Sequence, residues 1–288
     1  MVSRIQRITL LAIGASILAL AGTARGQSIV YPNFSNTSNL QLNGSTATPT
    51  TTDGTVLRLT SANPYQAGSA FSKTQIALTN SSFSTAFNFR ITGSGGIGDE
   101  NGAGADGFVF VIQPVANNVG SSGGGIGYQG IPNSLGIEFD TYNNGYSLGD
   151  QNNGNHIAVN TNGNLTDMFL TPISTPMNNG ALWSAWVDYN GTTNDLEVRL
   201  SQNGVRPATA LIQTNSINLS TLLGTNSAYV GFTSGTGAAW GNHDIVSWQF
   251  NDTYQPINQV GVPDGGATAL LLGLGFGVLV LARRRQRA

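Results

Sequence analysis

The chain of 288 residues contains no cysteine, which excludes disulfide bonds, thiol catalysis and cysteine-ligated zinc. It is also poor in charge, because Asp, Glu, Lys and Arg make up only 9% of the residues. The helix-forming composition rich in Glu, Lys and Leu is absent, and the chain contains 38 glycines with abundant Asn, Thr and Ser. This composition favours short strands joined by tight turns, and the length suits one large all-β domain.

Basic residues are scarce in the body of the chain. Between Gln27 and Asp264 there are five basic residues against all fourteen acidic ones, a net charge of −9, whereas the other seven arginines lie in the two ends. A protein that binds nucleic acid needs a basic face. We therefore predict that the body does not bind nucleic acid, and its charge is compatible with binding cations or neutral sugars.

The N-terminal segment has the three parts of a signal peptide. Two arginines precede an apolar stretch at 8–21, and the small residues Ala24 and Gly26 occupy the −3 and −1 positions of a cleavage site. We predict a signal peptide over residues 1–26, cleaved before Gln27. An uncleaved membrane anchor is the alternative, although the apolar stretch is short for a membrane span.

The C-terminal segment also has three parts. A motif formed by Val262, Pro263, Asp264, Gly265 and Gly266 precedes an apolar stretch at 267–282 and a cluster of arginines. A short apolar helix with a basic end is typical of a transmembrane segment with its arginines on the cytoplasmic side. The pattern at 262–288 resembles the PEP-CTERM family of sorting tails, in its VPDGG or VPDSG variant.

This resemblance implies that an exosortase-type enzyme processes the tail near Pro263. It also implies export to the cell envelope, outer surface or extracellular matrix of a Gram-negative bacterium. A polar linker at 253–261 would join the tail to the body. The alternative is a plain single-span anchor.

The body of the chain has the pattern of strands throughout. Alternating or continuous apolar runs of strand length occur at 57–60, 85–91, 108–112, 135–139 and 196–200. Asn-Gly and Asp-Gly pairs mark the turns between such runs, and a single helical turn is expected within 217–223. We find no internal repeat, so the prediction is one antiparallel β-sandwich over residues 27–252.

One strand and the loop after it contain an unusual set of polar residues. Glu138 and Asp140 are two positions apart, so both side chains point to one face of the strand. Two carboxylates buried side by side would repel each other and lose hydration, a cost that a bound divalent cation removes. The following segment adds Asn144, Asp150 and His156. An imidazole with carboxylates suits a transition metal, and carboxylate, amide and backbone oxygens suit calcium. Taken alone, these residues are equally compatible with a satisfied polar loop.

The wider pattern resembles the legume (L-type) lectins. Glu-Phe-Asp-Thr-Tyr-x-Asn at 138–144, followed by Asp150 and by His-Ile-x-Val-x-x-Asn from His156, is similar to their paired metal site. Four further motifs occur in the family's order: Ala-Asp-Gly at 105–107, a glycine loop at 123–128, a hairpin at 186–198, and a final loop and strand at 230–248. The resemblance implies a concanavalin-like jelly-roll sandwich that binds carbohydrate and is not an enzyme.

The resemblance also implies individual roles. The ligands of manganese or another transition metal would be Glu138, Asp140, Asp150 and His156. The calcium ligands would be Asp140, Asn144, Asp150 and the backbone oxygen of Tyr142. The sugar would contact Asp106, the backbone N–H of Gly125, the side chain of Asn144, the ring of Tyr142, and the backbone of Ala238 and Ala239. The family's Ala-Asp peptide is cis, which is therefore expected for Ala105-Asp106. The partner would be a glycan or exopolysaccharide, and a homodimer is among the arrangements allowed.

Several features depart from the family pattern or leave alternatives. The metal loop is longer than in legume members, Gln151 replaces the usual proline after Asp150, and Trp240 in the last loop has no assigned role. A glycoside hydrolase of the same architecture would have Glu-x-Asp-x-x-Glu, but Asn143 occupies the place of the second Glu. A structural matrix protein that has lost sugar binding stays open as a second alternative.

Two smaller expectations concern the core. We expect His243 and Asp244 to be a structural pair in the final strand and not a catalytic dyad. We expect the following tryptophans to lie in the core: Trp183, Trp186 and Trp248.

Overall fold

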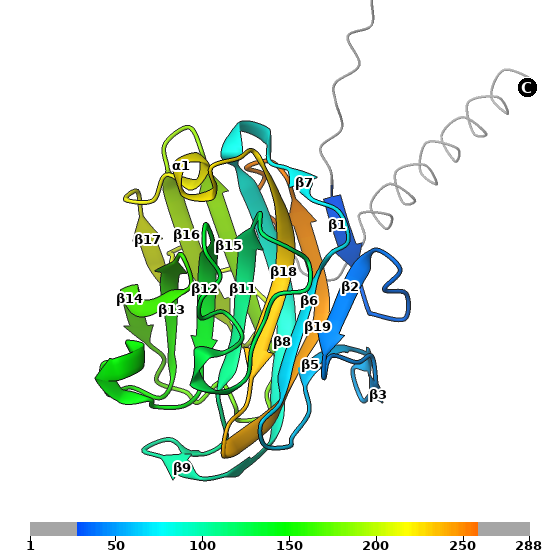
Figure 1. The fold of residues 1–288 in the computed structure, drawn as a ribbon, viewed down its shortest axis with the longest axis vertical. Helices are drawn as coiled ribbons and strands as arrows, with labels where there is room; N and C mark the ends of the chain where they lie inside the picture. Colours follow the sequence, from blue (N-terminus) through cyan, green and yellow to red (C-terminus); the bar gives the residue numbers. More distant parts are fainter. Residues whose placement is uncertain (1–27, 259–288) are drawn as a thin grey trace, which may run out of the picture.

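The computed structural model describes residues 28–258, and its regular structure is mostly antiparallel β-strand (Figure 1). One sheet contains, in spatial order, β1 (Ser28–Tyr31), β19 (Ala239–Asn251), β8 (Phe83–Gly96), β15 (Trp183–Asn190), β16 (Asp195–Ser201) and β17 (Ile212–Thr214), with β5 (Leu57–Thr60) also paired to β19. The other contains β14 (Asn164–Pro172), β13 (His156–Thr161), β12 (Leu135–Asp140), β11 (Gly107–Gln113), β18 (Ser227–Gly235), β6 (Ala67–Ser72) and β2 (Leu40–Gly44), with β7 (Ile76–Ala77) also paired to β18.

Shorter elements lie outside the two sheets. They are the β3 (Thr50–Thr51) and β4 (Gly54–Thr55) pair, the β9 (Gly98–Asp99) and β10 (Gly102–Ala103) pair, the α-helix α1 (Leu219–Leu223), and the 3-10 helices η1 (Thr79–Ser81), η2 (Gly123–Gly125) and η3 (Gly145–Leu148). The helix α1 falls within the segment predicted to form a helical turn, and the side chain of Asn218 caps it by accepting a hydrogen bond from the Thr221 N–H.

Aromatic rings fill the space between the two sheets. Phe87 of β8 packs edge-on against Phe232 of β18, with ring centroids 5.1 Å apart. Phe89 of the same strand packs edge-on against Phe108 of β11 at 4.9 Å, and Phe108 stacks on Phe139 of β12 at 4.8 Å. All of these side chains are buried. Removal of such rings from water is the main favourable contribution to folding. The two antiparallel sheets packed around these rings confirm the predicted β-sandwich.

The strand β11 is buried on both faces, which explains its continuous apolar run. Phe108 and Phe110 point into the core between the sheets, whereas Val109 and Val111 belong to a second apolar cluster on the outer face. Tyr128, the last residue of the glycine loop, is part of that second cluster. The glycine loop is therefore anchored against the outer face of the second sheet.

The expectation that the tryptophans lie in the core is confirmed, whereas His243 and Asp244, expected to be a structural pair, each have a different partner. The three tryptophans named above are buried. His243 is buried, with its Nδ1 2.6 Å from the hydroxyl of Thr60, and Asp244 accepts two hydrogen bonds of 2.7 Å from Arg58. Neighbours in a strand point to opposite faces, so each of these two residues has its own structural partner.

The predicted signal peptide at 1–26 and the predicted sorting tail at 262–288 with its transmembrane segment lie outside the described residues. Within residues 28–258, no helix has the length and apolar character needed to cross a membrane.

Candidate functional site

The candidate site lies where several strand ends meet. The register places Asp140, the last residue of β12, opposite both Gly107, the first of β11, and His156, the first of β13. Gly107 is also opposite Gly235, the last residue of β18. The loops that precede or follow these residues therefore gather at one end of the sandwich, the lower end in Figure 1, where β9 is labelled.

Glu138, Asp140 and His156 form a buried cluster with the chemistry of a metal site. Each offers one ligand atom, and these atoms all lie within 4.8 Å of one another. The Nδ1 of His156 lies 2.9 Å from the backbone oxygen of Asn153. A carbonyl oxygen can only accept, so Nδ1 has the proton and the lone pair is on Nε2, as a metal-binding imidazole requires. Glu138 accepts a hydrogen bond from the side chain of Asn160, so the side chain of this predicted ligand is also held by a neighbouring residue.

The electrostatics of this cluster favour a cation. Burial, together with the charges of Glu138 and Asp150, holds the pKa of Asp140 well above its usual value. The Oδ2 atom of Asp140 is buried and has no hydrogen-bond partner among the described residues. Burial lowers the pKa of His156 to about 4, so the ring is neutral near pH 7. A divalent cation would remove the repulsion between the carboxylates and accept the imidazole lone pair, so these residues fit a metal.

The predicted calcium ligands are brought together by the loop after β12. Asp140 Oδ1 accepts a 2.7 Å hydrogen bond from the Tyr142 N–H. The Asn144 N–H donates to the Asp150 carboxylate, and the Asn144 side-chain amide donates to the backbone oxygen of Tyr142 at 3.4 Å. The loop thus turns back on itself, so that two carboxylates, one amide and one backbone oxygen lie close together. Oxygen ligands of these kinds are the ones that calcium prefers.

The departures from the family pattern have a backbone explanation. Gln151 has φ of 51° and Asn152 has φ of 60°. Proline is restricted to φ near −65°, so a proline could not occupy position 151 in this loop conformation. The loop between Asp140 and Asp150 contains the 3-10 turn η3.

A short acidic hairpin supports the metal loop, and the sequence analysis did not identify it. Asp99 at the end of β9 accepts a 2.8 Å hydrogen bond from the Asn143 N–H. The neighbouring Glu100 accepts from the Asn143 side chain at 2.9 Å and from the Gly154 N–H at 2.8 Å. Gly154 is required here, because a Cβ atom would lie 1.9 Å from Asp99 Oδ2. The only signal in the sequence was an acidic pair within a glycine-rich segment.

Asp106 is the candidate sugar-binding carboxylate, and it lies beside the metal loop. The Ala105-Asp106 peptide is cis, as expected. Asp106 is 3% exposed, and its Oδ2 atom has no hydrogen-bond partner among the described residues. Burial and the charge of Asp150 raise the pKa of Asp106 to about 7. A hydrogen bond with the Asn144 side chain has the opposite, smaller effect on this pKa. Asn144 thus connects the candidate sugar-binding residue with the candidate metal site.

The glycine loop packs against the same group of residues. A Cβ atom at Gly124 would lie 2.6 Å from Asn144 Oδ1, so only glycine allows this approach. The Gly123 N–H donates to the backbone oxygen of Thr236 at 3.2 Å, which joins the glycine loop to the last loop. Gly125 is buried in η2 directly beside this contact. The structure therefore places Gly125 and Asn144 on adjoining loops.

The last loop forms another side of the site. Ala238 is exposed, whereas Ala239 is buried and pairs with Gly96 as the first residue of β19. Trp240 lies against the end of β8, since a Cβ atom at Gly95 would be 2.7 Å from its Nε1. This position gives Trp240 a structural role beside the loop. Tyr142 is half-buried, and burial, together with the charges of Asp99 and Asp106, raises the pKa of its hydroxyl.

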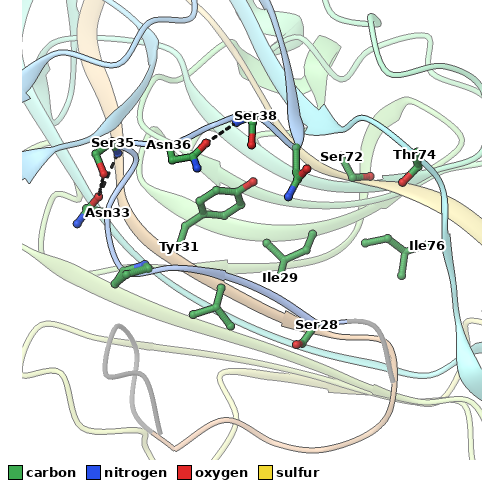
Figure 2. A pocket seen from close by; sticks show the side chains of 13 residues that line it. Ser28, Ile29, Tyr31, Asn33, Ser35, Asn36, Ser38, Ser72, Thr74 and Ile76 are labelled. Carbon is green, nitrogen blue, oxygen red and sulfur yellow. Dashed lines mark hydrogen bonds between the residues drawn. The ribbon is translucent and has the colours of Figure 1, made fainter. Parts of the chain in front are cut away.

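A separate pocket of about 770 Å³ lies along β1 and the segment after it (Figure 2). Ile29, Tyr31 and Ile76 contribute apolar side chains, and the rest of the lining is mainly Ser and Asn. Hydrogen bonds of 3.0 Å from the Ser35 and Ser38 N–H groups to preceding Asn side chains hold its rim. None of the residues predicted to bind metal or sugar lines this pocket.

The comparisons with known proteins agree with this geometry. Residues 27–263 match the model of the legume lectin domain, and residues 261–286 match that of the VPDSG-CTERM motif. A lectin-like protein of Arabidopsis thaliana is 29% identical over 270 residues, which cover 82% of this chain and 95% of that one. Lectin 1 of Laburnum alpinum is 31% identical over 187 residues, which cover 62% of this chain and 72% of that one.

Solved structures and larger proteins show the same relationship. The basic winged bean lectin, solved with Tn-antigen, is 25% identical with a TM-score of 0.64, covering 79% of this chain and 98% of that one. The chain also matches lectin-domain receptor kinases of A. thaliana, of which the first two matched are covered over 24% and 38% of their length. A β-sandwich with this set of loops defines a lectin-type carbohydrate-binding fold. The chain belongs to the legume lectin family and ends in a C-terminal sorting motif.

Proposed function

We propose that this protein is an exported lectin that binds a neutral glycan with the help of calcium and a transition metal such as manganese. The observation that most supports the proposal is the buried Oδ2 atom of Asp106, which has no hydrogen-bond partner among the described residues. A buried carboxylate oxygen without a donor is costly. A pair of sugar hydroxyls would supply the missing donors, and the adjoining Asn144 and Gly125 would complete the polar contacts.

The metal ligands that we propose are the residues assigned by the family resemblance. Glu138, Asp140, Asp150 and His156 would hold the transition metal, and Asp140, Tyr142, Asn144 and Asp150 would hold calcium. The ions would supply positive charge that offsets the crowded carboxylates. The residues of the chain would then do the recognition: Asn144, held by the loop, would be oriented toward the sugar before it binds, which reduces the entropic cost of binding.

The ligand class rests on family membership and on the composition of the site. The winged bean relative was solved with Tn-antigen, which makes a glycan the class to test first. The ring of Tyr142 would pack on the apolar face of the sugar, and the backbone of Ala238 and Ala239 would contact its edge. The identity of the sugar depends on the last loop, which differs from the family pattern at Trp240.

The direct test is a glycan array probed with the protein in calcium and manganese and again after chelation. We expect binding to a defined set of glycans that disappears with chelator and returns when the ions are restored. Binding to no glycan in either condition would favour a structural matrix protein with a lectin fold. Release of a shortened sugar would favour a glycoside hydrolase, although Asn143, at the place of the hydrolase's second glutamate, donates to Glu100 and accepts from the Gly145 N–H.

The C-terminal motif supports a proposal about sorting. It indicates an exported, cell-surface protein. We propose a signal peptide at 1–26, a lectin domain at 27–252, a linker at 253–261 and a tail at 262–288 that an exosortase-type enzyme processes near Pro263. Protein from the native host should then lack residues 267–288 by intact-mass measurement. Membrane-bound protein that retains the whole tail would instead establish a simple anchor.

A further inference from the structure

Tyr65 is an exposed aromatic residue in an unfavourable backbone conformation. Its side chain is 73% exposed, and its φ is 56°, in the left-handed region. Asparagine and glycine adopt this region readily, but a bulky residue there is a genuine outlier. Ile126 is a bulky residue with a similar φ of 48°, but its side chain is buried and contributes to the second apolar cluster. Packing therefore explains Ile126 and does not explain Tyr65.

The loop around Tyr65 is firmly attached to the last loop of the site. The Tyr65 N–H donates to the Gly237 carbonyl at 3.0 Å. On either side, the Gln66 N–H donates to the Thr236 hydroxyl at 2.8 Å, and that hydroxyl donates to the Asn63 carbonyl at 2.8 Å. Thr236 is completely buried. The backbone of Tyr65 is thus held in a fixed position, which limits the region of the surface that its exposed ring can occupy.

The fixed position of Tyr65 is close to the candidate sugar carboxylate. A Cβ atom on Gly237, the residue that accepts the Tyr65 hydrogen bond, would lie 3.8 Å from Asp106 Oδ2. Adding these contacts to the dimensions of one residue puts the Tyr65 nitrogen within roughly 10 Å of Asp106. On the other side of the last loop, the Ile97 N–H points to the next carbonyl, that of Ala238, at 3.4 Å. Ile97 is also exposed, so apolar residues flank the last loop on both sides.

We propose that Tyr65 forms a second subsite, in which its ring packs against the next sugar of an oligosaccharide whose first sugar is held by Asp106. The proposal rests on the proposed lectin function and makes it more specific, because it predicts a preference for chains of at least two sugars. The C–H face of a pyranose is apolar, and an exposed tyrosine ring on a fixed backbone offers a matching surface. Ile97 would border the same chain on the opposite side of the last loop.

The experiment compares binding of one sugar with binding of two. Titration calorimetry in calcium and manganese uses methyl α-D-galactoside and methyl α-D-mannoside as single sugars, with galactobiose and α-mannobiose as their disaccharides. For the pair that the parent recognises, we expect the disaccharide to bind about tenfold more tightly. In Tyr65→Ala this advantage should fall to about twofold or less while the affinity for the single sugar is unchanged, and Tyr65→Phe should retain the advantage.

Two further variants separate the ring from folding. Tyr65→Gly should lose the disaccharide advantage and unfold at the same or a higher temperature, because glycine adopts a positive φ without strain. Tyr254→Ala removes another exposed tyrosine. Tyr254 lies beyond the far end of β19, and the usual rise per residue of a strand puts it roughly 40 Å from the last loop. Its replacement should therefore change neither the affinity for the single sugar nor that for the disaccharide.

The outcomes distinguish this inference from the proposed function. Equal disaccharide advantages in the parent and in Tyr65→Ala would overturn the subsite and leave the lectin function intact. A parent that binds the single sugar and its disaccharide equally tightly would have the same consequence. A parent that binds none of the four sugars nor any glycan on the array would overturn the proposed function and the subsite together.

Discussion

In excess chelator, the Asp140→Asn variant is expected to be more stable than the parent, and in millimolar calcium it is expected to be less stable. The reversal follows from the raised pKa of Asp140, whose causes are burial and the charges of Glu138 and Asp150. A carboxyl with a raised pKa in the folded state destabilises the fold at pH values above its unfolded pKa, because the unfolded chain ionises it more easily. Without metal, at pH 8, this cost is present in the parent and absent from the amide.

The two halves of the reversal have separate causes. The metal-free variant gains stability because it has no carboxylate to bury. Ions that bind only the folded parent add about 2.7 kcal/mol to its free energy of unfolding when their concentration is one hundred times Kd. Asp140→Asn should gain little from calcium, because Asp140 is proposed to bind both ions.

Thermal and chemical unfolding of both proteins, with and without calcium and manganese, measures this effect. Asp244→Asn is a matched control: it removes another largely buried carboxylate, but one that pairs with Arg58 at 2.7 Å and not with the cluster. Its destabilisation should be the same with and without metal. A parent whose stability does not respond to calcium, together with no metal by elemental analysis, would contradict the metal site.

Asp106→Asn is expected to weaken sugar binding by about tenfold to a hundredfold while both ions stay bound. The amide keeps the shape of the side chain but replaces a charged acceptor with a neutral group, one half of which is a donor. Hydrogen bonds to a charged group contribute about 1.5–3 kcal/mol, and each 1.4 kcal/mol is a factor of ten in Kd. Because burial raises the pKa of Asp106 to about 7, the neutral amide should leave the fold equally stable or more stable.

The measurement pairs titration calorimetry of an array-identified sugar with the metal content and unfolding temperature of each variant. Asn144→Asp is the companion variant, because Asn144 bonds both with Asp106 and with the metal loop. It should disturb calcium and sugar together. If Asp106→Asn binds sugar as well as the parent does, the sugar site lies elsewhere and the role proposed for the buried carboxylate is wrong.

The sequence alone was sufficient wherever the relevant residues lie within one strand or turn. Because side chains in a strand alternate between faces, Glu138 and Asp140 could be assigned to one face before the structure was known. The same rule applied to β13 would have found Asn160, since it shares a face with His156 and lies four residues away; the structure shows that it binds Glu138. The continuous apolar run of β11 predicted burial on both faces, which its two apolar clusters confirm.

The position of Asp106 beside Asn144 was anticipated only through the family resemblance, because no local pattern relates residues 38 positions apart. The antiparallel register of β11, β12 and β18 brings their ends together, and register depends on packing across the whole sheet.

The hairpin with Asp99 and Glu100, and the loop with Tyr65, had no motif at all. Many of their partners are backbone N–H and carbonyl groups of distant loops, at Asn143, Gly154 and Gly237. Every residue except proline has both backbone groups, so a contact made through them imposes no residue type that a sequence could reveal. The positions of strands along the chain and the pair of carboxylates were therefore determined by the sequence pattern, whereas the surroundings of the proposed sugar site were decided by tertiary structure.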